Sequence, residues 1–207
     1  MPLRSWPQLP TGQPWQWRLA MLPAGWLHAA SLAGPGHGAA LWWLQLLSLA
    51  LLCKALLAAP RRRDGALLGW LFGTSWLVGT FWWLFTSMHT YGGLAAPLAA
   101  AGVLALALFL ALYYAAVCAL FKQFSFTHRA ANALIFAACW LLAELARGVL
   151  WTGFPWGASG YAHISGLLFP LARWVGVYGI GAAAAGLAML LAQVRRSDLR
   201  DPKIWAM

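Results

Sequence analysis

The residues best suited to chemistry lie in one stretch, residues 140–156, with the sequence W-L-L-A-E-L-A-R-G-V-L-W-T-G-F-P-W. Glu144 is the only acidic residue inside any long apolar run of the chain, and Arg147 follows it by three positions. At about 100° per helical residue, Trp140, Glu144, Arg147 and Trp151 fall within about 60° of one another. A carboxylate, a guanidinium and two indoles are therefore predicted to share one stripe of one helix.

The pair formed by Glu144 and Arg147 has two interpretations. Ionisable residues in an apolar helix are costly, and they usually face the protein interior or a water-filled cavity. In the first interpretation the two side chains, at i and i+3, neutralise each other and fix helix packing. In the second they line a cavity open to the outer face of a membrane, where the planar fork of Arg147 suits a phosphate such as a phospholipid headgroup.

Two loops rich in aromatic, polar, Gly and Pro residues are expected to lie beside this pair. Gly153 and Pro155 end the predicted helix, and the second loop is H-T-Y-G-G at residues 89–93. Non-helical backbone at membrane depth is tolerated only where protein buries it or water reaches it. An interfacial aromatic belt is the alternative explanation for the aromatic residues. The candidate substrate-binding or lipid-binding residues are Glu144, Arg147, Trp151, Phe154, Pro155, Trp156, His89 and Tyr91.

The sequence contains no self-contained catalytic or metal-binding set. Cys53, Cys118 and Cys139 are widely spaced inside apolar runs, which is typical of packing residues and not of a disulfide framework. Lys54 adjoins Cys53, but sequence neighbours on a helix point about 100° apart, so this lysine is not placed to activate the thiol. No two histidines are three or four positions apart, and no H-E-x-x-H motif occurs. We expect no catalytic residue, no metal site and no cofactor.

Composition predicts an all-α integral membrane protein. Hydrophobic residues make up 62% of the chain and charged residues only 9%. Several apolar runs reach or approach the roughly 20 residues that cross a bilayer as a helix. The basic residues lie in loops between these runs, so the net charge of +10 does not indicate a nucleic-acid partner. The pattern predicts a bundle of about six transmembrane helices, at residues 17–33, 39–58, 66–87, 97–121, 131–151 and 167–193.

The distribution of basic residues predicts the orientation. With the N-terminus inside, only Arg147 and Arg173 of the 14 basic residues fall on the outer half. The 12 others fall on the inner side: Arg4, Arg18, Lys54, Arg61, Arg62, Arg63, Lys122, Arg129, Arg195, Arg196, Arg200 and Lys203. Since basic residues concentrate on the cytoplasmic side, both termini are predicted to be cytoplasmic. The domain organisation is then a polar arm at residues 1–16, a transmembrane domain at 17–193 and a basic cytoplasmic tail at 194–207.

Several motifs together resemble one known family. They are G-W-L-F-G at residues 69–73, W-W-L-F-T-S-M-H-T-Y-G-G at 82–93 with A-P-L-A after it, W-L-L-A-E-L-A-R-G at 140–148 followed by T-G-F-P-W at 152–156, and G-V-Y-G at 176–179. This combination resembles the amino-terminal membrane region of apolipoprotein N-acyltransferase, over roughly residues 20–193. The E-x-x-R-G and T-G-F-P-W motifs are its most specific part.

The resemblance implies a location and a set of partners. The family acts in the bacterial inner membrane, where it transfers an acyl chain from a phospholipid to the lipid-modified N-terminal cysteine of an apolipoprotein. The family's Glu-Lys-Cys catalytic set belongs to a nitrilase-like domain that follows the membrane helices, and no residue of this chain matches it. The chain is therefore expected to be truncated and not catalytic alone, with phospholipid, an apolipoprotein and a separate nitrilase-like catalytic chain as partners.

Two functions outside this family are alternatives. One is a small membrane transporter or channel in which Glu144 and Arg147 line a polar pathway. The other is a structural membrane partner. The sequence has no internal symmetry of the kind that many transporters show, which disfavours the transporter.

Overall fold

The computed structural model describes residues 14–34 and 38–194, and all regular secondary structure in this part of the chain is helical, with no strand. Most of the predicted arm, the middle of the predicted break at 34–38 and nearly all of the predicted tail lie outside the described residues. The long helices are α1 (Pro14–Leu32), α2 (Trp42–Ala58), α3 (Arg62–Thr80), α5 (Ala96–Phe124), α6 (Arg129–Val149) and α7 (Ala172–Ala192). The short ones are α4 (Trp82–Thr86), the π-helix η1 (Ser87–Tyr91) and the 3₁₀ turns η2 (Leu150–Thr152), η3 (Ser159–His163) and η4 (Phe169–Leu171).

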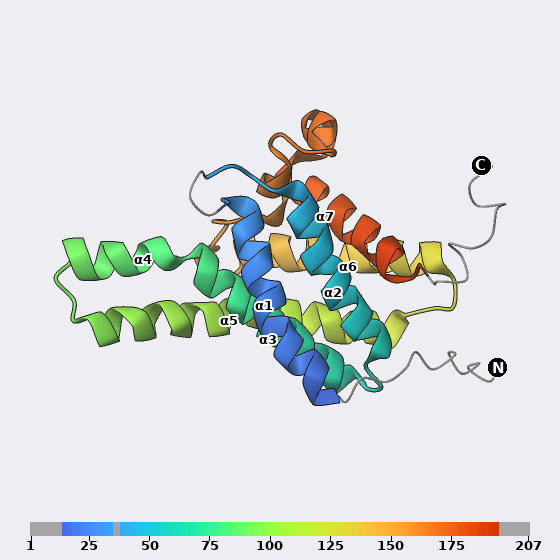
Figure 1. The fold of residues 1–207 in the computed structure, drawn as a ribbon, viewed down its shortest axis with the longest axis horizontal. Coiled ribbons are helices and arrows are strands. Elements are labelled where there is room, and N and C mark those ends of the chain that lie inside the picture. The colour runs from blue at the N-terminus through green and yellow to red at the C-terminus, as the bar shows by residue number, and fades with distance from the viewer. Residues whose placement is uncertain (1–13, 35–37, 195–207) are drawn as a thin grey trace.

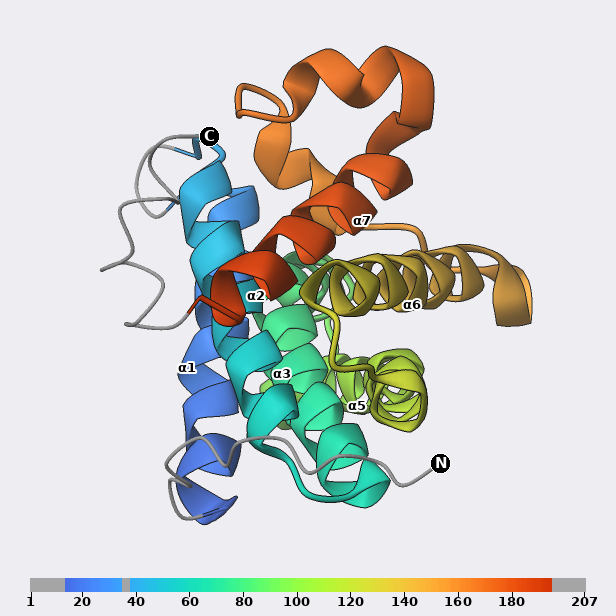
Figure 2. The ribbon, with the colours of Figure 1, turned by 90° about the vertical axis from the view of Figure 1, so that its right-hand side faces the viewer.

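The six long helices close into a ring of neighbours. Around this ring α1 contacts α2, α2 contacts α7, α7 contacts α6, α6 contacts α5, α5 contacts α3, and α3 returns to α1. Figures 1 and 2 show α5 and α6 running alongside each other while α1, α2 and α3 cross them. Each predicted helix therefore overlaps one long helix of the structure, with the largest difference at residues 66–87.

Three helices are long and apolar enough to cross a membrane, and the number rises to four if a bent pair is one span. The three are α5, α6 with η2, and η4 with α7. The bent pair is α3 followed by α4 and η1, whose axes differ by 50° at Phe81. The prediction of one continuous helix at residues 66–87 is therefore wrong, because the backbone of Phe81 leaves the helical region at φ −99° and ψ 15°.

Beyond this bend, α4 and η1 pair with the first half of α5 to form a hairpin. Figure 1 shows the hairpin projecting from the body of the bundle, with the turn between η1 and α5 at its tip. Pro97 lies in the first turn of α5, where its missing N–H leaves no hydrogen bond unmade. The residues of the H-T-Y-G-G motif are thus carried away from the centre of the molecule.

Helices α3 and α5 are in close contact in the interior. A Cβ atom on Gly69 would lie 2.6 Å from the carbonyl oxygen of Tyr114 and 2.7 Å from Sγ of Cys118, so only glycine permits this approach. Apolar lipid tails provide little hydrophobic driving force between helices, and close packing at small residues provides much of the attraction instead. Gly65, Gly69 and Gly73 recur every four residues along α3 and all face α5, so they form a helix-packing surface.

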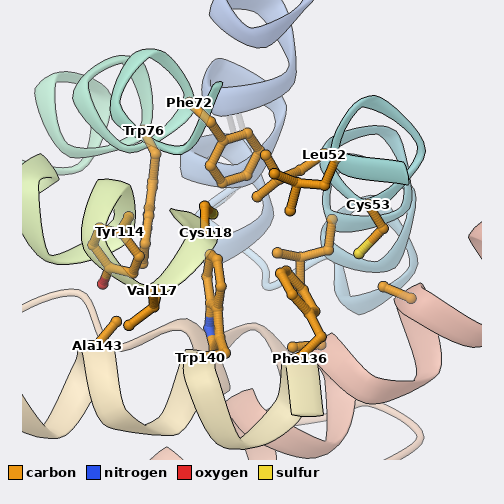
Figure 3. Close-up of a cluster of buried hydrophobic side chains, with 14 of the residues drawn as sticks. Leu52, Cys53, Phe72, Trp76, Tyr114, Val117, Cys118, Phe136, Trp140 and Ala143 are labelled. Carbon is orange, nitrogen blue, oxygen red and sulfur yellow. The ribbon is translucent and has the colours of Figure 1, made fainter. Parts of the chain in front are cut away.

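An aromatic cluster fills the centre of the ring. Trp76, Tyr114 and Trp140 converge from α3, α5 and α6 (Figure 3). The rings of Trp76 and Trp140 are stacked with centroids 5.8 Å apart, and His28 of α1 meets Trp76 edge-on at 4.4 Å. All four side chains are fully buried. This cluster connects four helices and supports the buried face of α6.

Candidate functional site at the end of helix α6

Helix α6 carries the predicted polar stripe on its buried face, but the stripe is shorter than predicted. Trp140, Glu144 and Arg147 are all fully buried. Trp151 is not part of this face, because α6 ends at Val149 and Trp151 adopts a left-handed conformation with φ 55° and ψ 48°. Its side chain is 82% exposed. The prediction that Trp151 shares the helical stripe is wrong for this reason.

Arg147 binds the loop that follows its own helix. Its Nη1 donates to the carbonyl oxygens of Phe154 and Trp156, each at 2.7 Å. Its Nε donates to the hydroxyl of Tyr114 on α5 at 3.1 Å. The guanidinium therefore ties the T-G-F-P-W segment to two helices.

Glu144 holds the same loop further along. Its Oε1 accepts a hydrogen bond from the backbone N–H of Ser159 at 2.9 Å. The hydroxyl of Ser159 accepts from the indole N–H of Trp140 at 3.1 Å, and its carbonyl accepts from Gln45 Nε2 at 2.5 Å. Ser159 is thus a buried junction between α6, the loop and α2.

The direct contact between the two charges is weak. Arg147 Nη2 and Glu144 Oε1 are 4.0 Å apart, at the outer limit for an ion pair. Arg147 Nη2 and Glu144 Oε2 have no hydrogen-bond partner among the described residues. Each charge is therefore held mainly by the loop backbone and only secondarily by the other charge. Because neither side chain is exposed, neither lines an open cavity in this structure.

The loop begins with a sharp turn in which three consecutive residues have positive φ. They are Trp151, Thr152 and Gly153, with φ of 55°, 74° and 76°. Such values are uncommon for residues with a side chain, and strained backbone persists only where surrounding contacts hold it. A Cβ atom on Gly153 would collide with the carbonyl oxygen of Gly148, so only glycine fits there. The backbone N–H of Phe154 then donates to the Arg147 carbonyl at 2.7 Å.

The aromatic residues of this loop divide into anchored and exposed ones. Phe154 packs edge-on against Phe81, at the bend after α3, with ring centroids 4.9 Å apart. Pro155 and Trp156 are exposed, and the ring of Trp156 lies 6.2 Å from that of Trp83 on α4. The structure therefore brings the T-G-F-P-W segment next to the base of the projecting hairpin.

His89 and Tyr91 lie in η1, close to the tip of that hairpin. Both are exposed, Tyr91 by 84%, and the imidazole Nδ1 of His89 lies 2.8 Å from the carbonyl oxygen of Leu94. Helix α4 separates these two residues from the bracket formed by the hydrogen bonds of Arg147 to the carbonyl groups of Phe154 and Trp156. The eight predicted site residues thus form two groups, one at the hairpin and one at the end of α6.

His163 is a buried residue of this region that sequence reasoning did not select. It lies in η3 beside the ring of Trp42, with centroids 6.3 Å apart. Neither ring nitrogen has a hydrogen-bond partner among the described residues. Burial lowers the pKa of His163 below its ordinary value of 6.5, because the charged imidazolium would lose its water.

Ser159, Gln45 and Tyr114 were also not selected. Gln45 carries a detectable signal, because it is a lone amide in the apolar run 39–58. Tyr114 and Ser159 carry none, because nothing in their local sequence points to α6. The three cysteines are buried and free, in agreement with their prediction as packing residues. Among residues 14–34 and 38–194 no cluster of three His, Cys, Asp or Glu residues could hold a metal ion.

Comparison with known proteins shows which family this sequence resembles. A family profile described as "Apolipoprotein N-acyltransferase N-terminal domain" matches residues 24–190. The protein named apolipoprotein N-acyltransferase in Verminephrobacter eiseniae is 57% identical over 206 residues, which are 98% of this chain and 38% of that relative. Proteins of the same name in Ralstonia nicotianae and Bordetella bronchiseptica are 47% and 40% identical, over 72% and 90% of this chain and 29% and 36% of their own lengths.

Proposed function

The chain belongs to the apolipoprotein N-acyltransferase family, and from that premise we propose that it is a membrane domain that binds phospholipid and supports acyl transfer without performing it alone. The chain spans 38% of the length of its Verminephrobacter eiseniae relative. The proposed reaction of the whole enzyme is transfer of a phospholipid acyl chain to the N-terminal lipid-modified cysteine of an apolipoprotein. A nitrilase-like region, in the same polypeptide or in a separate chain, supplies the catalytic Glu, Lys and Cys.

The observation that carries the proposal is the bracket that Arg147 forms with the carbonyl groups of Phe154 and Trp156. The bracket fixes a loop whose Trp151 and Trp156 side chains point out of the bundle and remain exposed. Indole rings favour the boundary between headgroups and acyl chains, since one part of the ring system is apolar and the N–H is polar. A rigid loop with two exposed indoles therefore suits the binding of a phospholipid at the membrane surface.

Within this proposal the candidate residues have different roles. Trp151, Trp156, His89 and Tyr91 are exposed and contact the lipid. Glu144, Arg147, Phe154 and Pro155 hold the loop in the shape that allows the contact. Direct binding of a phosphate by Arg147 would require the loop to move, because the guanidinium is fully buried and its Nη1 and Nε are occupied.

The proposed topology is six membrane crossings with both termini in the cytoplasm of a bacterium and the bundle, at residues 17–193, in its inner membrane. Contacts between helix ends support it. Arg18 pairs with Asp64 at 3.2 Å, and Arg62 donates to Gln123 at 2.7 Å, which joins the basic ends of α1, α3 and α5. Gln193 Nε2 donates to the Arg129 carbonyl at 3.1 Å, which joins the basic ends of α7 and α6. Such an arrangement is expected if these ends share one membrane face.

The transporter or channel has less support. A polar pathway requires water to reach the ionisable residues that line it. Glu144 and Arg147 have no exposed surface, and Arg147 Nη1 and Glu144 Oε1 bind the loop. A purely structural role would leave the exposed indoles of the loop without a function.

The test is photo-crosslinking of the purified 207-residue chain in nanodiscs that contain a phosphatidylethanolamine with a photoreactive acyl chain. Mass spectrometry of the digested protein is expected to show labelling concentrated in residues 150–169. The double variant Trp151→Ala/Trp156→Ala is expected to reduce that labelling severalfold. The matched control, Trp26→Ala/Trp43→Ala, removes two other exposed indoles, on α1 and α2, and is expected to leave the labelling unchanged. Even labelling of all lipid-facing helices, or no response to the loop variant, would refute the proposal.

A further inference from the structure

We propose a second lipid site at the opposite end of the bundle, in a groove between α3 and α5 that binds one anionic phospholipid. The groove has a volume of about 600 Å³ and is lined by Arg61, Arg62, Arg63, Ala66, Ala116, Ala119, Leu120 and Gln123. Figure 2 shows the two helices that form it side by side. This proposal does not depend on the function of the loop after α6, because the two sites share no residue.

The charges at the groove favour an anion. Arg61, Arg62 and Arg63 are all exposed. Arg61 and Arg63 make no ion pair or side-chain hydrogen bond with any residue of the ranges that the structure describes. The one acidic residue next to them, Asp64, is bound by Arg18 from α1. Three guanidinium groups therefore meet at one end of the groove without an acidic side chain to neutralise them.

One of the three arginines is held in place. Arg62 Nη1 donates to the side-chain oxygen of Gln123 at 2.7 Å, across the groove from α3 to α5. This bond orients the guanidinium and leaves its other N–H groups available to a ligand. A planar guanidinium presents paired donors that match the oxygens of a phosphate diester.

The rest of the groove wall is apolar. Ala66 on α3 and Ala116, Ala119 and Leu120 on α5 form a surface of small side chains with one larger aliphatic group. Ala116 and Leu120 are exposed. A soluble phosphate would use only the basic end, whereas an anionic phospholipid places its phosphate at the arginines and an acyl chain along the alanines. The combination of the two surfaces identifies the occupant as a lipid.

The position of the groove agrees with this occupant. It lies where α3 begins and α5 ends, close to the basic ends of α1 and α6. In the proposed topology this is the cytoplasmic surface, where anionic lipids attract basic segments beside membrane helices. The lipid would fill the space between two helices whose closest packing lies deeper in the bundle, at Gly69.

The experiment measures binding of phosphatidylglycerol to the full chain by native mass spectrometry, with phosphatidylcholine and inorganic phosphate as comparison ligands. We expect the wild-type chain to retain one phosphatidylglycerol in preference to phosphatidylcholine and no inorganic phosphate. The variant Arg61→Gln/Arg63→Gln is expected to weaken phosphatidylglycerol binding by about tenfold or more, because each arginine near an anionic headgroup contributes about a fivefold factor. The charge-matched control is Lys54→Gln/Arg129→Gln, which removes two basic residues outside the groove.

A second pair of variants tests the acyl-chain part without changing any charge. Ala116→Leu/Ala119→Leu fills the groove and is expected to displace the lipid, whereas Ala101→Leu/Ala105→Leu adds the same volume to exposed positions elsewhere on α5. Equal loss in both charge variants would mean a general electrostatic effect and would overturn the site. Retention of the lipid in the filled variant, or equal binding of inorganic phosphate, would also overturn it.

Discussion

Arg147 and Glu144 illustrate how two buried charges can be stabilised without a short ion pair. Six hydrogen bonds connect them and Ser159 to backbone or side-chain groups of other segments: Arg147 Nε to Tyr114, Arg147 Nη1 to Phe154 and to Trp156, Ser159 N to Glu144, Trp140 to Ser159, and Gln45 to Ser159. Hydrogen bonds to a charged group are stronger than those between neutral groups, and their loss leaves buried partners unsatisfied. The two residues therefore act as positioning residues for the loop.

This arrangement predicts that replacing both residues destabilises the fold more than replacing either one, because they hold different parts of the loop. Arg147→Leu leaves two loop carbonyl groups without their donor, and Glu144→Leu leaves the Ser159 N–H without its acceptor. Each replacement is expected to destabilise the fold by about 2–4 kcal/mol, and the double variant by more than either. Thermal unfolding of the chain in nanodiscs and protease cleavage within residues 150–163 measure the effect. Arg173→Leu, at an exposed arginine, is the control. A double variant as stable as the wild type would indicate that the pair only neutralises itself.

His163 should give the stability of the chain a dependence on pH. Burial lowers its pKa in the folded state, so between the folded pKa and the unfolded value near 6.5 the unfolded chain binds more protons. The contribution of His163 to the free energy of unfolding is therefore fully present above about pH 6.5 and is lost as the pH falls below that value. The measurement is the unfolding temperature at pH 8 and pH 5.5. His163→Gln is expected to reduce the difference, while the exposed control His89→Gln keeps it. Equal pH dependence in wild type and His163→Gln would contradict this account.

At the scale of the helices, the contact of α3 with α5 and the bend after α3 set the position of the site. Gly69 lets the two helices approach closely, and the bend at Phe81 turns α4 away so that Phe81 meets Phe154. The loop after α6 therefore rests on the end of α3. A change in the spacing of α3 and α5 would be transmitted to the loop through Tyr114, which contacts both Arg147 and the stacked indoles.

Replacement of Gly69 tests this packing. In Gly69→Ala the added methyl would lie 2.6 Å from the Tyr114 carbonyl oxygen, so the helices must separate. We expect a loss of about 1–3 kcal/mol in the free energy of unfolding. Gly102→Ala is the matched control, because a methyl there meets only the Met88 side chain at 3.6 Å and improves helix propensity. Denaturation in detergent mixtures compares the two. Similar stability of both variants would show that the contact between α3 and α5 is looser than described.

At the scale of the whole molecule, the ring of six helices gathers basic helix ends at one face and the aromatic loops at the other. The contacts Arg18–Asp64, Arg62–Gln123 and Arg129–Gln193 lie at the first face. The contacts Phe81–Phe154 and Trp83–Trp156 lie at the second. Such a separation agrees with the concentration of basic residues on the cytoplasmic side of membrane proteins.

The proposed topology predicts the result of reporter fusions. Fusions within residues 61–63 are expected to report the cytoplasm, and fusions within residues 89–93 or 157–163 the periplasm. The reason is the basic asymmetry of the loops, which orients the helices during insertion. Paired alkaline phosphatase and green fluorescent protein fusions at each position give opposite readouts and control for expression. A cytoplasmic result at residues 157–163 would exclude the six-crossing arrangement.

The amino-acid sequence alone determined the helical class, the positions of the six long helices and the family. These depend on local information: apolar runs interrupted by Gly, Pro and basic residues, and short motifs such as T-G-F-P-W. Proximity of Glu144 to Arg147 was also predictable, because both lie on one helix at i and i+3. The common face of Trp140, Glu144 and Arg147 followed from the same periodicity, whereas their burial is a finding of the structure.

Only the tertiary structure decided which groups satisfy those charges. Tyr114 and Ser159 lie 33 residues before Arg147 and 15 residues after Glu144, respectively, and no local pattern specifies where such segments meet. Trp151 left the predicted stripe because three consecutive left-handed residues turn the chain out of the helix. The bend at Phe81 likewise brings its ring against Phe154, which is 73 residues further along the chain. Local periodicity determines which face of a helix is buried, whereas the path of the connecting loops determines what that face contacts.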